Sequence, residues 1–373
     1  MSKRLLAFFS YTHGMGGHCV SITTLYDEFK KHGDVELINL GFSESALNSI
    51  RDGRFYSLND NTTFSIIRSL VKYVKREGFD EILCVDTESY SYLRVASLLC
   101  NIKIVLIKAG GPNPLRYFPY CNSLVNFSEE NDKHFRKSSK FSRTSLYVIP
   151  NRVSPKILSE NSEILSRLAD EYFLCMRISR IGENYHDSLQ LTLDEFKRIR
   201  LDFPEENLLL VIIGVVEDSN ILDMLQKKSE SNVVFLTDTV HTYMSSRFVH
   251  YADLYIGCGR SAMEALSLNK NVAIPSTLTN ELVFFRKETS KDIAYANFSP
   301  RVRGAVANNR SLILENNNFS KSYFNDHLSV ERAPELYRRV FDYAKPETFN
   351  SAFDILLGLG VTLFKLFRFK LTR

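Results

Sequence analysis

Short, nearly continuous runs of apolar residues recur along the whole chain, and they constrain its fold more than any other feature. They are rich in Val, Ile and Leu, which is typical of parallel β-strands covered on both faces. The predicted strands are 5–11, 35–40, 81–86, 102–110, 123–128, 145–150, 171–179, 207–214, 232–238, 253–259 and 271–276.

The segments between these runs show helical periodicity. Residues 61–78 and 187–199 each place apolar side chains on one stripe and charged ones off it. Alternating strands and helices predict an α/β fold of parallel sheets joined by right-handed crossovers. In 61–78 the predicted apolar stripe is Phe64, Ile67, Leu70, Val71 and Val74.

A length of 373 residues is too long for one ordinary core, so we expect two domains. Pro150, Asn151 and Pro155 interrupt the pattern, and we place the boundary at about 155–170. The predicted parts are an N-terminal domain (1–160), a C-terminal domain (161–330), a crossover helix (331–348) and an amphipathic tail (349–373).

The composition fits a globular protein and disfavours several classes. Apolar residues make up 44% of the chain and charged residues 24%, while a net charge of +4 does not indicate a nucleic-acid binder. The six cysteines form no C-x-x-C pair, which predicts buried thiols in a reducing compartment. The apolar start at 5–11 is short and lacks an A-x-A cleavage site, so we interpret it as a strand and expect a cytoplasmic protein.

The stretch "ADLYIGCGRSAMEALSLNKNVAIP" (252–275) reads as strand, glycine turn, helix and strand. Such a unit points the N–H groups of its helix start into the crevice beyond the strand's end, where α/β proteins bind phosphates. Glu264 stands three residues after Ser261 and is expected in the first turn of the helix. The segment is therefore a candidate phosphate site.

Several motifs in order resemble the GT-B fold, and within it the retaining glycosyltransferases of family 4. The resemblance covers about residues 1–345. It implies two Rossmann-like domains that face a cleft and C-terminal helices that cross back to the first domain. The segments that carry it are the glycine loop and helix at 13–40, "VIPNRV" at 148–153, "MRISRIGENYHDSLQLTLDEFKRI" at 176–199, the nucleotide-binding core at 207–275 and "FSKSYFNDHLSVERAPELYRRVF" at 319–341.

The resemblance implies nucleotide-binding residues in the second domain. Glu264 matches the second glutamate of an E-x7-E motif, which accepts hydrogen bonds from the ribose hydroxyls. Alternatively, it is a first-turn charge that stabilises the helix by roughly 0.3–1 kcal/mol. Ile256 replaces the first glutamate of the motif. Gly259, Arg260 and Ser261 of "GCGRS" would instead offer N–H groups and a guanidinium to a diphosphate.

Arg177 and Arg180 are further candidates. The family uses an arginine and a lysine at this place to neutralise the departing diphosphate; Arg177 matches the arginine, and Arg180 matches the lysine only after a shift. Fixed cations in a dry cleft stabilise the charge that the leaving group gains in the transition state. The alternative is a pair of surface arginines.

The first domain carries two candidate segments. Gly16 and Gly17 in "HGMGGH" could let the loop approach the donor phosphate or the acceptor, or could serve turn packing alone. Cys19 stands where the third glycine of a dinucleotide-binding fingerprint would be, which disfavours such a site there. After the strand at 81–86, Asp86 and Glu88 could orient an acceptor hydroxyl, or could cap the helix that follows.

The segment 349–373 differs from the rest of the chain. The uncharged residues 355–364 would span only ~15 Å as a helix, about half of a ~30 Å hydrocarbon core, so a membrane crossing is not expected. We predict a peripheral anchor at a membrane surface, or else a helix packed on this protein or on a partner. The apolar face comprises Phe353, Leu356, Leu357, Gly360, Phe364, Phe367 and Leu371, with Lys365, Arg368, Lys370 and Arg373 near its end.

Together these features predict transfer of a sugar from a nucleotide-sugar to a carbohydrate or lipid-linked glycan, at the inner face of the cytoplasmic membrane and in surface polysaccharide synthesis. The resemblance implies retention of configuration, no metal and no cofactor. The predicted catalytic residues are Asp86, Glu88 and Arg177. Two alternatives stay open: a UDP-sugar 2-epimerase of the same fold, and a non-catalytic GT-B-like subunit.

Overall fold

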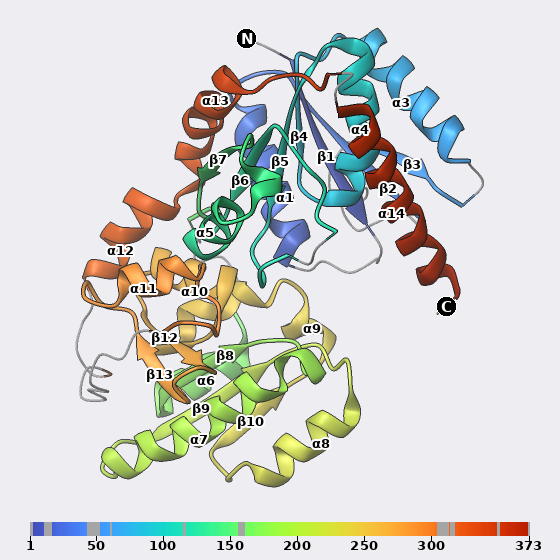
Figure 1. The fold of residues 1–373 in the computed structure, drawn as a ribbon. Helices are drawn as coiled ribbons and strands as arrows, with labels where there is room; N and C mark the ends of the chain where they lie inside the picture. Colours follow the sequence, from blue (N-terminus) through green and yellow to red (C-terminus); the bar gives the residue numbers. More distant parts are fainter. Residues whose placement is uncertain are drawn as a thin grey trace. The chain divides into compact units, whose positions relative to one another are not determined.

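The computed structural model describes residues 3–10, 17–42, 53–59, 62–114, 117–155, 161–303, 313, 318–348 and 351–371. The chain forms two compact units. The first unit combines Met1–Arg152 with Val330–Arg373, and the second unit is Val153–Ser329. The last helices of the chain therefore belong to the first unit (Figure 1).

The first unit is built on a seven-stranded sheet in which all neighbouring strands are parallel. The strand order reverses beside β1, because the chain runs from β1 to β2 and β3 on one side and then returns to β4 on the other. In sheet order the strands are β3 (Arg54–Ser57), β2 (Val35–Gly41), β1 (Arg4–Ser10), β4 (Glu81–Cys84), β5 (Lys103–Lys108), β6 (Ser123–Asn126) and β7 (Ser145–Val148).

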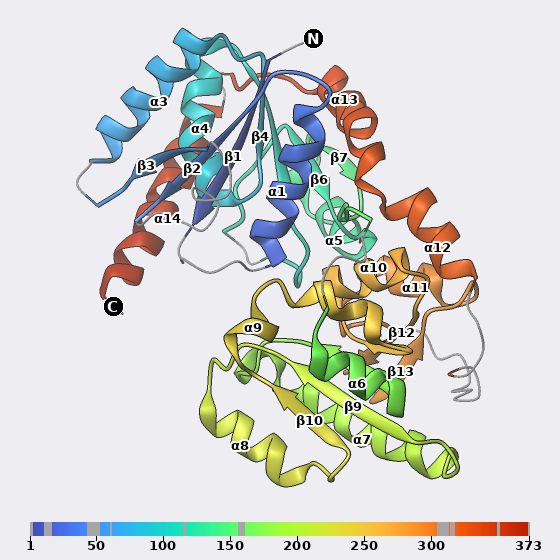
Figure 2. The ribbon, with the colours of Figure 1, turned by 180° about the vertical axis from the view of Figure 1, so that it is seen from behind.

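Helices cover both faces of this sheet (Figures 1 and 2). One face packs against α1 (Gly17–Lys30) and α13 (Ala333–Tyr343). The other packs against α3 (Thr63–Glu77), α4 (Thr87–Cys100), α5 (Glu129–Arg136) and α14 (Ala352–Leu371). This double cover explains why the strands read as continuous apolar runs.

The second unit contains a six-stranded sheet that is parallel except for its last pair. Its order reverses beside β8 in the same way as the first sheet reverses beside β1. In sheet order the strands are β10 (Val233–Leu236), β9 (Leu208–Ile213), β8 (Phe173–Ile178), β11 (Leu254–Ile256), β12 (Asn271–Ser276) and β13 (Glu281–Phe284).

The two faces of the second sheet also carry separate cores. Alternate strand residues point to opposite faces: Leu209, Val211 and Ile213 lie in one core, and Leu208, Leu210 and Ile212 in the other. The helices α7 (His186–Asp202) and α8 (Ser219–Lys228) cover one face. The other helices are α6 (Glu163–Glu171), α9 (Thr239–Thr242), α10 (Gly259–Ser267), α11 (Ser290–Tyr295) and α12 (Phe319–Tyr323).

The predicted α/β fold with two Rossmann-like parallel sheets is confirmed. Among the described residues, the sequence prediction missed the strands β3 and β13. The apolar stripe of α3 was also partly wrong, because Phe64 is exposed while Ile66 and Tyr73 are buried beside Leu70 and Val74.

Candidate functional site

The carboxyl end of β8 lies at the point where the strand order of the second sheet reverses. Doubly wound sheets bind ligands in the crevice at such a point. Here β8 pairs with β11, with Tyr255 opposite Met176, so the residues that follow in each strand lie at the same edge. Those residues are Arg177 in β8 and the turn that begins α10 after β11.

Arg177 is a buried cation at this edge, only 2% exposed. Its Nη2 donates to the Ser188 hydroxyl at 3.1 Å, and its Nη1 lies 3.6 Å from the Cys258 sulfur. Its Nε has no hydrogen-bond partner in the part of the chain that the structure describes. Among the residues that the structure describes, no carboxylate bonds this guanidinium. A buried charge without a counterion is costly, so the arrangement favours an anionic ligand.

The start of α10 lies beside Arg177. Cys258 occupies the N-cap position and makes no side-chain capping bond. The first-turn N–H groups of a helix need acceptors, and an uncapped start can take them from a ligand anion. Gly259 has a φ of 62°, a left-handed conformation that favours glycine, and the space where a Cβ would stand is open. The N–H of Gly259 is itself bonded to the Phe298 carbonyl at 2.6 Å.

Glu264 is buried and paired with Arg260, whose Nε donates to its Oε1 at 2.9 Å. Burial lowers the pKa of Arg260, and the negative charge of Glu264 opposes that shift. The expected first-turn position of Glu264 was wrong, because α10 begins at Gly259 and places Glu264 in its second turn. The helix dipole stabilises negative charges in the first turn, so it does not explain a carboxylate in the second turn. Its contact with ribose stays a prediction.

The structure separates the two predicted arginines. The Arg180 side chain is 52% exposed, and its Nη1 pairs with Glu217 Oε1 at 2.8 Å. This hydrogen bond raises the pKa of Arg180. Arg180 thus fits the alternative of a surface arginine better than Arg177 does. The diphosphate role of Arg180 stays a prediction.

The structure also describes the surroundings of Ser261 and Ile256 in this segment. The Ser261 hydroxyl donates to the Cys258 carbonyl at 3.2 Å, which holds the turn in shape. Ile256 is fully buried in β11. The residue at the first position of the E-x7-E motif is therefore part of an apolar core in this chain.

The first sheet presents a second group of polar side chains where its own strand order reverses. Asp86 is the N-cap of α4 and accepts the Ser89 N–H at 2.7 Å, which is the capping arrangement considered from the sequence. Glu88, in the first turn, accepts from the Thr87 hydroxyl and from Lys365 Nζ, both at 2.8 Å. Their role towards an acceptor stays a prediction.

His18, near the start of α1, belongs to the same region. Burial lowers the pKa of His18 to about 4, with the nearby Glu88 carboxylate opposing the shift and Lys108 adding to it. His18 is therefore neutral at pH 7. Gly17 is the first residue of α1, whereas Gly16 lies outside the described residues.

Sequence reasoning missed two side chains that define these regions. Ser188 supports the Arg177 guanidinium from the first turn of α7, and Lys365 reaches Glu88 from α14. A hydroxyl at a helix start is a common feature, so the sequence held no signal that links Ser188 to Arg177. In the sequence, Lys365 is recognisable only as a basic residue of the tail.

Comparison with known proteins supports the fold but yields no close relative. No protein-family model matches the chain, and no curated protein matches it. Among solved structures, a glycosyltransferase from Rickettsia africae is 12% identical over 92% of this chain and 99% of its own, with a TM-score of 0.66. Anabaena HepE, solved with UDP and glucose, is 12% identical over 92% and 100%, with a TM-score of 0.61.

The trehalose-6-phosphate synthase OtsA gives a similar match, 11% identical over 93% of this chain and 100% of its own, with a TM-score of 0.62. At such identities a structural match establishes the fold. The chain has the GT-B fold, as the order of its motifs predicted.

Proposed function

We propose that the protein is a glycosyltransferase that moves a sugar from a nucleotide-sugar to a hydroxyl of a carbohydrate or lipid-linked glycan. The observation that carries the proposal is the buried Arg177 guanidinium, which no carboxylate of the described chain bonds and which lies beside the uncapped start of α10. A diphosphate would supply the missing negative charge.

The residues around Arg177 suit a diphosphate leaving group. Negative charge grows on the diphosphate as its bond to the sugar breaks, and a guanidinium already held in a dry site stabilises that charge without reorganisation. The first turn of α10 adds N–H donors with a favourable dipole. Ser188 and Cys258 fix the guanidinium in place. The Arg260–Glu264 pair would hold the ribose end.

The similar structures support this choice of ligand class. HepE has been solved with UDP, with UDP-glucose, and with UDP and glucose, and the E. coli trehalose-6-phosphate protein has been solved with UDP-2-fluoro glucose. These facts concern those proteins. For this chain they make uridine diphosphate the first nucleotide to test.

The acceptor side is proposed from the first unit. Asp86 and Glu88 stand where the order of the first sheet reverses, at the edge where an acceptor hydroxyl would approach. We further propose metal-independent transfer with retention, in surface polysaccharide synthesis at the cytoplasmic face of a membrane.

Thermal unfolding with UDP, GDP, ADP and CMP tests the nucleotide site. A ligand at ~100 times its dissociation constant adds about 2.7 kcal/mol to the free energy of unfolding. We expect one nucleoside diphosphate to stabilise the wild type, and Arg177→Met and Glu264→Ala to abolish the effect. Arg200→Met is the matched control, because Arg200 is a partly exposed, paired arginine of the second unit that is not a candidate site residue. If none of the nucleotides stabilises the wild type, the non-catalytic alternative gains support.

Product analysis separates the enzyme classes. A transferase releases nucleoside diphosphate from its donor faster when acceptor glycans or lipids from the source cells are added. A 2-epimerase instead produces a changed sugar without any acceptor. Acceptor-independent sugar conversion would contradict the proposal.

A further inference from the structure

The helix α14 is firmly attached to the first unit along one face. Its residues Ile355, Leu359 and Leu366 are buried in the core that also contains α3 and α4. Thr362 is buried between them and bonds the Ser91 hydroxyl at 3.0 Å. The tail predicted as an anchor is therefore a docked helix on its inner side.

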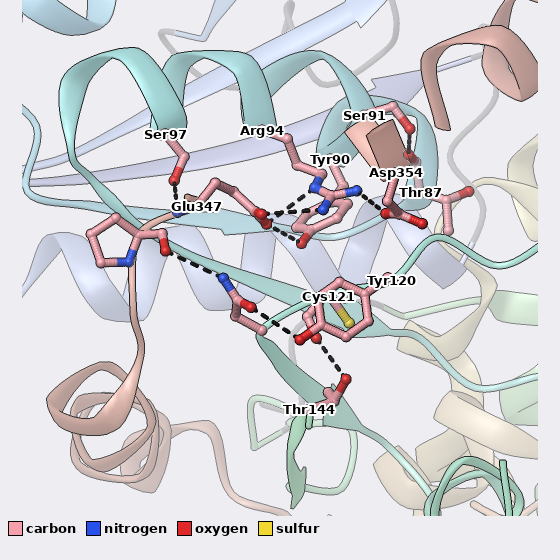
Figure 3. Close-up of polar contacts among 12 residues, drawn as sticks. Thr87, Tyr90, Ser91, Arg94, Ser97, Tyr120, Cys121, Thr144, Glu347 and Asp354 are labelled. Carbon is pink, nitrogen blue, oxygen red and sulfur yellow. Dashed lines mark hydrogen bonds and ion pairs between the residues drawn. The ribbon is translucent and has the colours of Figure 1, made fainter. Parts of the chain in front are cut away.

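Ion pairs fasten both ends of this contact. Along successive turns of α4, Arg94 pairs with Asp354 at 2.5 Å and Glu88 with Lys365 at 2.8 Å. Arg94 also donates two bonds of 3.1 Å to Glu347, which lies just before α14 (Figure 3). Arg94 and Glu347 are almost fully buried, and Tyr90 adds a third bond to this carboxylate. A helix held in this way has a fixed orientation.

The outer face of α14 is apolar. Its large side chains are between 54% and 80% exposed and recur at helical spacing between Phe353 and Phe367. Contiguous exposed apolar surface of this kind marks an interaction site on a soluble protein. The residues of this outer face are Phe353, Leu356, Leu357, Phe364 and Phe367.

Positive charge gathers in the sequence at the end of this helix. Residues 355–373 contain no Asp or Glu but include Lys365, Arg368, Lys370 and Arg373. The helix α3 covers the same face of the sheet as α14, and both pack on α4 (Figures 1 and 2). It adds the exposed Arg68, Lys72, Lys75 and Arg76. Basic side chains on the same side of the sheet as an apolar helix face complement an anionic bilayer. Each basic residue near such a surface contributes about 1 kcal/mol to binding in general.

We infer that the outer face of α14, with the basic residues of α3, docks this protein onto an anionic membrane surface. No helix among the described residues is long and apolar enough to cross a bilayer. The helix would therefore lie in the plane of the interface, with its phenylalanines and leucines at the boundary of headgroups and acyl chains. Docking does not depend on the proposed catalytic function.

The attachment of α14 also determines which part of the first unit would lie near the membrane. Lys365 bonds Glu88 at the edge of the first sheet where the acceptor is proposed to approach. A bilayer on the outer face of α14 would thus lie close to that edge. This step rests on the proposed function, and it selects acceptors that are anchored in the membrane by a lipid over freely dissolved glycans.

Vesicle co-sedimentation of the full chain tests the membrane surface. The probes are vesicles of phosphatidylcholine alone and of phosphatidylcholine with phosphatidylglycerol, without nucleotide. The outer-face variant combines Leu356→Ser, Phe364→Ser and Phe367→Ser. The matched control combines Leu201→Ser, Val240→Ser and Tyr243→Ser, which are equally exposed side chains of the second unit. Unfolding curves check that both variants fold.

The wild type and the control should bind the anionic vesicles, more weakly at high salt, and the outer-face variant should bind about tenfold less or weaker. Arg68→Glu with Lys72→Glu should reduce binding to anionic vesicles only. Absence of wild-type binding, or an equal loss in the control, would overturn the inference. The inference would also be overturned if light scattering showed that the wild type is a dimer and the outer-face variant a monomer. Because nucleotide stabilisation is measured separately, failure here leaves the donor site untouched.

Discussion

Arg94 in α4 of the first unit and Arg177 in β8 of the second unit are both buried arginines, yet their surroundings differ. Arg94 is 1% exposed and is bonded by the carboxylates of Glu347 and Asp354. Arg177 is 2% exposed and is bonded by a hydroxyl and a thiol. The first charge is balanced within the folded chain, whereas no carboxylate of the described chain bonds the second.

This difference separates a structural arginine from a candidate binding residue. Burying a guanidinium is costly, and a folded chain tolerates the cost where carboxylates or a ligand compensate it. The Arg94 network stabilises the attachment of α14. The Arg177 site, in contrast, is expected to gain its counterion only when the nucleotide binds.

The largest effect is expected at Glu347. The substitution Glu347→Gln leaves Arg94 with a buried, undercompensated charge, so the free energy of unfolding should fall by about 3–5 kcal/mol in urea titrations. Adding Arg94→Met to Glu347→Gln should recover part of this loss, because it removes the charge itself. The exposed pair Glu335–Arg339 supplies the control, and Glu335→Gln should change stability by less than about 1 kcal/mol. Equal effects at both sites would contradict the structural role of the network.

Arg177 should show the opposite pattern. The substitution Arg177→Met should lower turnover of the identified donor by about 10²–10³-fold, since it removes one fixed charge on the leaving group. The unfolding free energy of the free protein should not fall as it does at Glu347, because no buried carboxylate loses its partner. A stability loss as large as that of Glu347→Gln, with unchanged turnover, would make Arg177 a structural residue.

The Arg260–Glu264 pair lies between these extremes, because it is buried and paired but adjoins the candidate site. A double-mutant cycle of Arg260→Met and Glu264→Gln should give a coupling of about 1–3 kcal/mol in unfolding. Nucleotide stabilisation should be lost in the Glu264→Gln single variant as well. Coupling in stability without any change in nucleotide binding would show that the pair serves α10 alone.

A smaller effect is expected at the outer end of the α14 contact. The Lys365 side chain is about half exposed, so Lys365→Met should lower the unfolding free energy by about 1 kcal/mol or less. Asp354→Asn removes a carboxylate from the buried Arg94, so it should lower the unfolding free energy more than Lys365→Met does. Urea titrations of the two variants provide the check. The reverse order would locate the main attachment of α14 at Glu88.

The smallest effect at mild pH concerns His18. Its folded pKa of about 4 lies below the ordinary value of 6.5, so the unfolded chain takes up a proton first as the pH falls. The stability contributed by the neutral ring is therefore complete above pH 6.5 and is lost progressively towards pH 4. His18→Gln should flatten this decline, by about 1 kcal/mol or less at pH 6. Unchanged pH profiles in urea titrations would refute the shift.

Much of the fold could be predicted because it follows from local patterns. Apolar runs and helical stripes reflect which neighbours a residue has in its own strand or helix. The missed β3 has only four residues, none of them buried, and β13 is an equally short strand at the antiparallel edge. The outer face of α14 was also visible as a stripe in the sequence. Its large apolar side chains between Phe353 and Phe367 are exposed, whereas the side chain of Leu371 lies outside the described part.

The candidate site was predictable only in part. Strand-end arginines and a glycine turn before a helix pointed to Arg177 and to the start of α10. The sequence could not show that Arg177 is buried without a carboxylate while Arg180 is exposed and paired with Glu217. It also could not show that Asp86 accepts the Ser89 N–H and so caps α4.

The sequence by itself determined the α/β class, the two parallel sheets and the amphipathic character of the last helix, because each depends on periodicities within a few turns of chain. Only the tertiary structure decided which charges are compensated. Glu347 reaches Arg94 across 253 positions of sequence, and Lys365 reaches Glu88 across 277. The free energy of a buried charge depends on the groups that folding brings around it, so its role was fixed by the packed chain.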